Sequence, residues 1–150
     1  MERNKVKYSV GDLFIIRLEN GQRILGLITH RKQKTKLLAG YFWKFSSEFE
    51  VNNSELKKTK VILITKFSGL GFEVGNWSLI GKMDEWCEDN WKLPRLRKHN
   101  CLINKYYAIT YDKNLEEISE YEISQHEAST LYEDGNHGYI SLENVLSRCT

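Results

Sequence analysis

The pair Asn20-Gly21 constrains the fold of this chain more than any other feature. It lies between two runs rich in isoleucine and leucine, Leu13–Leu18 and Arg23–Thr29. Asn-Gly between apolar runs favours a tight type I′ turn, because both central residues of that turn must adopt a positive φ. The sequence therefore predicts an antiparallel hairpin near the start of the chain. Gly11-Asp12 is predicted to form the turn before its first strand.

Further strands are predicted where β-branched and aromatic residues gather. These segments are Leu37–Phe45, Val61–Phe67, Trp77–Ile80, Asn104–Tyr111 and Glu117–Ile123. In the last of them, glutamates alternate with Ser119, Tyr121 and Ile123, which is the period of a strand with two different faces.

Helices are predicted mainly near the end of the chain. Ser124-x-x-Glu127 matches a capping box, in which each side chain satisfies a backbone donor, and the helix is expected to continue through Leu131 and Tyr132. The tail Tyr139–Cys149 is amphipathic at helical spacing, and Asn52–Lys60 and Asp84–Trp91 could each hold a helical turn. The predicted fold class is α+β: a predominantly antiparallel sheet, which could form a small open barrel, with two or three short helices.

Length and composition fit one soluble domain over residues 1–150. Hydrophobic residues make up 41% and charged residues 28%, near globular averages, and the single proline argues against long extended loops. No apolar run is long enough to span a membrane, and the N-terminus lacks the apolar stretch of a signal peptide. Cys87, Cys101 and Cys149 show no paired spacing, which suits a reducing compartment, so the expected location is the cytoplasm.

The net charge of +2 hides an uneven distribution of charge along the chain. Residues 1–60 hold 13 Lys or Arg and 6 Asp or Glu, whereas residues 106–150 hold 2 and 9. If the fold keeps the two ends apart, the resulting dipolar surface would steer a charged partner.

The sequence contains no recognisable catalytic, metal or cofactor motif. His99 and Cys101 are two residues apart, but a zinc site needs about four converging ligands, usually with a tight pair that is missing here. A nucleophilic pair of Cys101 with a histidine has no support, because such pairs are spatial rather than sequential. The glycines at 69, 71, 75 and 81 do not precede a helix as in a phosphate-binding loop. Neither a metal, a cofactor nor an enzymatic activity is predicted.

Two charged segments suggest binding functions. The basic loop Arg31–Lys36, beside Tyr41, Phe42 and Trp43, could bind single-stranded nucleic acid by stacking. A pI near 8.4 is low for such a protein, which makes solvated lysines and core aromatics the simpler interpretation. The second segment is acidic, contains no Lys or Arg, and comprises Glu116, Glu117, Glu120, Glu122, Glu127, Glu133 and Asp134. It is either an ordinary solvated edge or a surface complementary to a basic groove, with Tyr121 or Tyr132 as the apolar anchor.

Several motifs, taken in order, resemble a family of bacterial immunity proteins, the twenty-sixth family named in polymorphic toxin and contact-dependent inhibition systems. The matching positions include Gly11, Asp12, Gly21, Gly26, Gly75, Trp77, Ile80, Gly81 and Pro94. The most specific segment is Gly-x-Trp-x-x-Ile-Gly, and the resemblance extends from about Tyr8 to the tail. These positions are expected to build turns and core, not an interface.

The resemblance implies a protein that binds one cognate toxin and blocks it stoichiometrically, with no turnover. We expect the toxin to be a nuclease domain and the acidic segment between Glu116 and Asp134 to contact it. Nucleic acid is a less favoured partner, and no membrane partner is expected.

Overall fold

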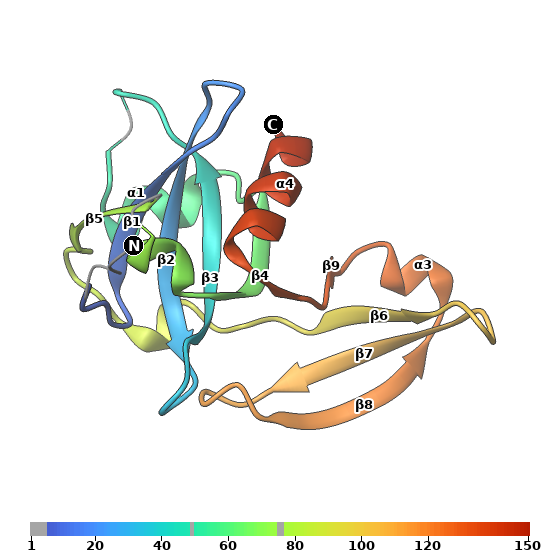
Figure 1. Cartoon of the computed structure of the whole chain (residues 1–150). Coiled ribbons are helices and arrows are strands. Elements are labelled where there is room, and N and C mark those ends of the chain that lie inside the picture. The colour runs from blue at the N-terminus through green and yellow to red at the C-terminus, as the bar shows by residue number, and fades with distance from the viewer. Residues whose placement is uncertain (1–5, 49, 75–76) are drawn as a thin grey trace.

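The structure is a computed structural model that describes residues 6–48, 50–74 and 77–150. Within these residues the regular structure is mostly β-sheet (Figure 1). In chain order, the elements are β1 (Asp12–Arg17), β2 (Arg23–Arg31), β3 (Leu37–Lys44), α1 (Asn53–Lys58), β4 (Leu63–Ser68), α2 (Leu70–Glu73), β5 (Trp77–Lys82), the 3-10 helix η1 (Glu88–Asn90), β6 (Leu96–Asn100), β7 (Lys105–Tyr111), β8 (Glu117–Ile123), α3 (Gln125–Ala128), β9 (Tyr132–Glu133), β10 (Asn136–His137) and α4 (Tyr139–Cys149).

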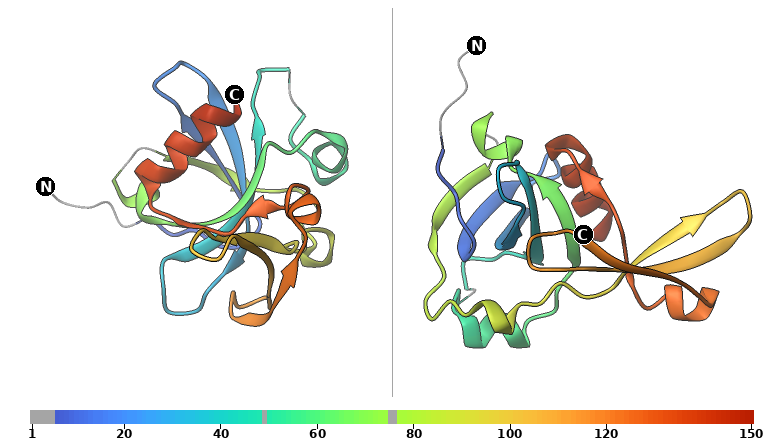
Figure 2. Two further views of the ribbon diagram at one scale, coloured as in Figure 1. Left: turned by 90° about the vertical axis from the view of Figure 1, so that its right-hand side faces the viewer. Right: turned by 90° about the horizontal axis from the view of Figure 1, so that it is seen from below.

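The first sheet contains six strands in the order β10-β4-β3-β2-β1-β5. Its long strands pair antiparallel, and only the two-residue β10 runs parallel to its neighbour β4. α4 lies across the sheet (Figures 1 and 2) and buries Leu142 and Leu146 in the core of that face. A second cluster, with Trp43 and Trp91 fully buried, forms around Leu25 and Leu27. Alternate residues of these strands face opposite sides, so apolar residues at nearly every position are buried on both faces.

Aromatic side chains fill the centre of the larger cluster. Phe14 is completely buried, and its ring lies 4.8 Å from that of Phe72 and 5.6 Å from that of Trp77. Phe42 and Phe67 complete the group through edge contacts. Such rings contribute large apolar areas and prefer these offset and perpendicular arrangements. The first sheet therefore has its own substantial core.

We call the first sheet, together with the helices that pack on it, the body. The second sheet extends to one side of the body as an arm (Figures 1 and 2). It contains four strands in the order β8-β7-β6-β9, and we call this sheet together with α3 the arm. α3 covers one face, where Ala108, Ile123 and Ala128 form a small buried cluster. The arm thus buries far fewer apolar side chains than the body.

Two short strands near the end of the chain connect the two sheets. β9 pairs in parallel with β6 in the arm, and β10 pairs in parallel with β4 in the body. Between them, the Asp134 amide donates to the Arg97 carbonyl over 2.7 Å. A segment of only six residues, Tyr132–His137, therefore contributes a strand to each sheet and joins them.

The predicted hairpin is confirmed, but the predicted type of its turn is wrong. β1 pairs with β2 from Leu13↔Leu27 to Arg17↔Arg23. Gly21 has a φ of +85°, whereas Asn20 is not among the residues with positive φ, so the turn is not type I′. The Gly21 amide donates to the Leu18 carbonyl, and the Leu18 amide to the Gln22 carbonyl, as in a three-residue loop that ends in a left-handed glycine. The Asn20 side chain accepts from the Gln22 amide and supports this alternative.

The α+β class and the dominance of antiparallel strands are confirmed, with two corrections to the helix that follows Ser124. The strands of the described residues divide into two separate sheets and form no closed barrel. The helix after Ser124 ends at Ala128, and Tyr132 lies in β9 because its backbone pairs with Leu96 instead. Ser124 does accept from the Glu127 amide, but the Glu127 carboxylate contacts Arg95 and not the helix start. The sequence did not predict β6, β9 or β10. β6 pairs with the adjacent β7, but its polar residues from Arg97 to Asn100 lack the apolar pattern of a strand, and the two-residue β9 and β10 pair only with strands distant in the sequence.

Gly26 gives a first testable prediction. A Cβ atom built on Gly26 would lie 2.3 Å from the Phe14 ring, which has no free space to move into. We expect Gly26→Ala to lower the free energy of unfolding by about 1–3 kcal/mol, as other overpacked cores do. Urea denaturation should show this loss, whereas Gly138→Ala, where nothing lies within 4 Å of the new methyl group, should leave the unfolding midpoint nearly unchanged. Equal midpoints for the two variants would contradict the tight packing of Phe14 against β2.

Candidate functional site

The acidic segment predicted from the sequence lies mainly on β8, at the outer edge of the arm. Residues 117 to 122 of this strand are all exposed, and only Ile123 is buried. Side chains on both faces of β8 therefore contact solvent, which is unusual for a strand in a sheet with a core. Tyr121, the predicted anchor, keeps 43% of its surface exposed. This exposure makes β8 the part of the predicted site most accessible to a partner.

Cations from elsewhere in the arm partly neutralise its carboxylates. Glu120 lies 3.5 Å from the Lys98 ammonium, and Glu122 lies 3.1 Å from that of Lys105. These side chains are between 35% and 56% exposed, so the pairs are weak and easily exchanged.

Arg95 lies at the junction of β8 and α3. Its Nη1 donates to the Tyr121 hydroxyl over 2.5 Å and to the Glu127 carboxylate over 3.0 Å. Arg95, from a third segment, thus brings together Tyr121 of the predicted strand and Glu127 of the predicted helix. The hydrogen bond to Tyr121 orients its ring at the edge of the arm.

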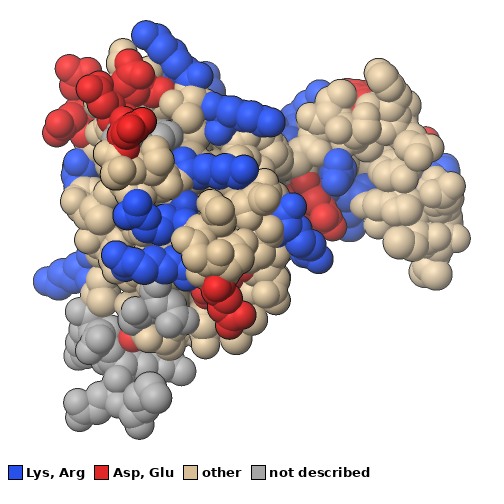
Figure 3. Space-filling model, turned by 90° about the horizontal axis from the view of Figure 1, so that it is seen from above, with Lys and Arg blue, Asp and Glu red and all other residues tan. Residues whose placement is uncertain are grey.

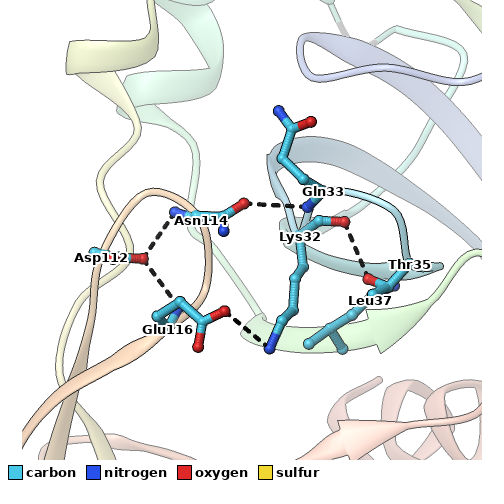
Figure 4. A network of polar contacts seen from close by, with 7 residues as sticks. All are labelled: Lys32, Gln33, Thr35, Leu37, Asp112, Asn114 and Glu116. Atoms are coloured by element: carbon cyan, nitrogen blue, oxygen red, sulfur yellow. Dashed lines mark hydrogen bonds and ion pairs between the residues drawn. The ribbon is translucent and has the colours of Figure 1, made fainter.

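Glu116 has a different role, because it belongs to the contact between the arm and the body (Figure 4). Its carboxylate lies 3.2 Å from the Lys32 ammonium of the β2–β3 turn. Beside it, the Gln33 amide donates to the Asn114 side chain over 3.1 Å. Asp112 holds the turn between β7 and β8, since one of its oxygens accepts from the Asn114 and Glu116 amides. Glu116 therefore positions the arm and is a poor candidate for a contact with a partner.

Asp134 is also structural, and it forms the most buried ion pair that the described residues contain. Its carboxylate lies 3.1 Å from the Lys66 ammonium, and the two side chains are 16% and 6% exposed. The Tyr111 hydroxyl donates to both Asp134 oxygens and accepts from Lys66. Burial, followed by the hydrogen bond to Asp134, raises the pKa of Tyr111. This cluster joins β4 of the body to β7 of the arm and to the residue that follows β9.

The other predicted residues divide between core and surface. Tyr132 is half-buried and packs against the core of the body, so it is not available as an anchor. Glu133 and Glu117 are exposed. The structure thus brings Glu117, Glu120, Tyr121, Glu122 and Glu127 together at the edge of the arm, and places Glu116, Tyr132 and Asp134 elsewhere.

Sequence reasoning missed three exposed apolar side chains on the arm. Leu102 and Ile103, in the turn between β6 and β7, are 97% and 54% exposed, and Ile118 on β8 is 62% exposed. Leu102 and Ile103 are adjacent, so they form a small apolar tip of the arm that is accessible to another molecule. The sequence feature that could have indicated this tip is Cys101–Asn104, a turn with two apolar residues at its centre.

Two of the three aromatic residues beside the basic loop, which the alternative nucleic-acid site required, are not accessible, and the third, Tyr41, is half-buried. Phe42 and Trp43 are completely buried, so they offer no platform on which a base could stack. Arg31 lies over the Tyr8 ring and donates to its carbonyl, while Lys32 pairs with Glu116. The loop's charges are used largely within the protein.

The uneven distribution of charge along the sequence does not become two oppositely charged lobes. The basic start of the chain supplies Lys32, and β4 supplies Lys66, and both pair with acidic residues from the end of the chain. In the view from above, both the arm and the body carry side chains of both signs (Figure 3). Long-range steering by a molecular dipole is therefore weaker than the sequence implied.

The described residues form no constellation that could support metal chemistry. No group of three or more His, Cys, Asp or Glu among them could hold a metal ion. The Cys101 sulfur does lie 3.7 Å from Nδ1 of His99, whose other ring nitrogen contacts Asn104, but all three are exposed at the turn between β6 and β7. In the part of the chain that the structure describes, no helix has the length and apolar character that crossing a bilayer requires.

The motif residues occupy turns and close contacts in the body. A Cβ on Gly11, whose φ is +89°, would lie 2.8 Å from the Trp86 ring, and the Asp12 carboxylate accepts from the Ser9 amide. Trp77 is 4% exposed and packs in the aromatic core, as expected, whereas Ile80 is 50% exposed. Gly81 has a φ of +124°, and Pro94 is half-buried ahead of β6. Gly75 lies outside the described residues.

Comparison with known proteins identifies a family. No curated protein and no solved structure matches the chain significantly. The model of one protein family, described as Immunity protein 26, matches residues 9–108, about two thirds of the chain. The match begins before β1 and ends within β7, earlier than the resemblance seen in the sequence, so β8, α3 and α4 lie beyond it. The chain therefore belongs to the Immunity protein 26 family.

Proposed function

We propose that this protein neutralises one cognate antibacterial toxin in the cytoplasm by binding it stoichiometrically through the arm. Membership of the family carries the proposal, since it implies a toxin partner and immunity proteins are generally not enzymes. Binding would cover the active site or the substrate-binding surface of the toxin. Protection inside a cell requires a long-lived complex, for which a Kd near or below about 1 nM, or about −12 kcal/mol, is expected.

Three observations support the arm as the binding surface. It extends from the body, so a partner can reach both faces of β8 (Figure 2). It exposes Leu102, Ile118 and Tyr121, although its own buried cluster is small. Finally, β8 lies beyond the region matched by the family, where residues specific for an individual toxin are expected.

The carboxylates of β8 support a nuclease as the toxin class. Glu117, Glu120 and Glu122 are exposed on one strand, and the pairs formed by Glu120 and Glu122 with lysines are weak surface pairs. A nuclease binds a polyanion through a basic groove, and a row of carboxylates is complementary to such a groove. Tyr121 would supply the apolar anchor, since buried aromatic residues dominate interface energies.

The identity of the partner is tested by co-purification. The tagged protein is captured from its native host, washed at high salt, and its companions are identified by mass spectrometry. A single protein in stoichiometric amount, whose toxicity in cells is suppressed by this chain, is the expected result. Co-purification of nucleic acid in place of a protein would contradict the proposal and favour nucleic-acid binding through the basic loop Arg31–Lys36.

The contribution of β8 is tested by charge reversal at Glu117, Glu120 and Glu122, each changed to Lys. Because like charges would now face a basic groove, we expect the association rate constant to fall at least about tenfold at low ionic strength. Stopped-flow measurement of association with the captured toxin provides the rate. The matched control carries the same charge change on exposed residues of the body, Glu19→Lys, Glu48→Lys and Glu50→Lys. An equal loss in both variants would show that net charge, and not β8, controls binding.

A further inference from the structure

The outer edge of β8 is the longest regular open strand edge in the described structure. β8 ends its sheet, and no described strand is hydrogen-bonded beyond it. The other terminal strands are protected: β9 and β10 have two residues each, and β5 is interrupted by a register shift opposite Leu13 and Phe14. β8 shifts register only at its start, and it pairs regularly with β7 from Ser119 to Ile123. In an antiparallel edge strand, about half of the backbone donors and acceptors point away from the sheet and can pair with another chain.

The charges of β8 disfavour pairing with a second copy of itself. The strand and its preceding turn carry Glu116, Glu117, Glu120 and Glu122, and residues 114–123 include no Lys or Arg. Antiparallel pairing of two β8 strands would place carboxylates opposite carboxylates, which is destabilising. A strand with cationic side chains would instead be attracted by these carboxylates. The edge is therefore open to pairing with another strand, but its charges disfavour pairing with a second copy of β8.

The side chains of β8 define the pattern of a complementary strand. Glu120 and Glu122 lie on one face of the sheet. Directly across the sheet from Glu122 are Tyr107 and then Lys98, and across from Glu120 are Ile109 and then Leu96. Tyr121 lies on the opposite face, the one covered by α3, with Ala108 and Arg97 as its partners. A strand added beside β8 would thus place alternate residues against carboxylates and against the Tyr121 ring.

We propose that β8 binds an extended segment of the toxin as a fifth strand of the arm, with cationic residues at alternate positions and apolar residues between them. This inference deepens the proposed function, on which it rests for the identity of the partner. Backbone hydrogen bonds would supply affinity, and the alternation of Glu and Tyr would supply specificity, as in other cases of strand addition. The lysines at 98 and 105 are exposed and would release their glutamates to the incoming cations at little cost.

The test uses two synthetic peptides in place of the unidentified toxin segment. One alternates lysine with valine, and the other alternates glutamate with valine at the same length. Each is titrated into the isotope-labelled full chain, and backbone amide shifts and hydrogen-exchange rates are measured by NMR spectroscopy. We expect the lysine peptide to shift β8 resonances and to protect those β8 amides that exchange freely without it. In the variant with Glu117, Glu120 and Glu122 changed to Lys, its affinity should fall at least about tenfold, and the glutamate peptide should bind instead.

The control and the contrary outcomes separate this inference from the proposed function. The variant with Glu19, Glu48 and Glu50 changed to Lys should bind the lysine peptide as the unmodified chain does. Equal binding of both peptides, protection at β5, or no protection of β8 at the highest soluble concentration would each overturn strand addition. If the captured toxin still binds and is neutralised in such a case, the proposed function stands and only its mode is wrong. If the chain takes up the lysine peptide on β8 but captures no toxin, β8 does add a strand and the proposed function is wrong.

Discussion

Replacing Asp134 with Asn should lower the free energy of unfolding by about 3–5 kcal/mol, because it leaves the Lys66 ammonium buried without a carboxylate. The Lys66 side chain is only 6% exposed, and its remaining contacts are the Tyr111 hydroxyl at 2.8 Å and the Tyr111 ring, whose centre lies 4.0 Å away. Neither replaces a negative charge. Urea or guanidinium unfolding, followed by circular dichroism, measures the loss.

Glu133→Gln is the matched control for this experiment, since it removes one carboxylate from the adjacent, exposed residue and should change stability by less than about 0.5 kcal/mol. Adding Lys66→Met to Asp134→Asn should restore much of the stability, because the unpaired charge is then removed as well. A loss for Asp134→Asn no larger than that for Glu133→Gln would show that water reaches the pair in solution. The arm would then be joined to the body less firmly than the structure indicates.

Trp77→Ala is expected to be as damaging, with a loss of about 3–5 kcal/mol from the cavity it leaves in the aromatic core. Trp77 lies 5.6 Å from Phe14, 5.7 Å from Phe67 and 5.2 Å from Phe72, measured between ring centres. Gly71 packs against the indole so closely that a Cβ there would lie 2.3 Å from it, and a glycine has no side chain that could fill the space left by the ring. Thermal and urea unfolding should both report the loss.

Tyr121→Ala is the informative comparison for Trp77→Ala, since it also removes an aromatic ring but from the exposed edge of the arm. We expect Tyr121→Ala to change stability by less than about 0.5 kcal/mol and to weaken protection against the toxin. Trp77→Ala should lower stability and reduce protection only through loss of folded protein. If Tyr121→Ala destabilised the chain as much as Trp77→Ala, Tyr121 would belong to the core of the arm and could not be assigned to an interface.

Local patterns predicted most of the long strands and the last helix correctly. The Ile- and Leu-rich runs around Asn20-Gly21 form the hairpin, and the alternation in Glu117–Ile123 marks β8. The amphipathic spacing of the tail corresponds to α4, which buries Leu142 and Leu146. These features depend on interactions within a few residues, or on one face meeting the core, and both are visible as sequence periodicity.

The functional site was predicted only in part. The exposed position of the glutamates on β8 follows from their alternation in a strand, but the role of Asp134 does not. Its partner Lys66 is distant in the sequence and lies on β4, in a strand that is otherwise largely apolar. Pairing between distant charges depends on which strands become neighbours, and no local pattern specifies this.

The sequence by itself determined the hairpin, the antiparallel character of the fold, the glycine and tryptophan positions that build the body, and the family to which the chain belongs. Only the tertiary structure decided that the strands divide into a body and an arm. The two strands that join these parts, β9 and β10, are too short to show a period in the sequence, and they form only through pairing with β6 and β4. The tertiary structure also decided which acidic residues are used to join the arm to the body and which are accessible to a partner. Glu116 and Asp134 pair with lysines of the body, while the carboxylates of β8 stay at an open edge. The physical reason is that burial and ion pairing depend on three-dimensional proximity, whereas the sequence records only order and spacing.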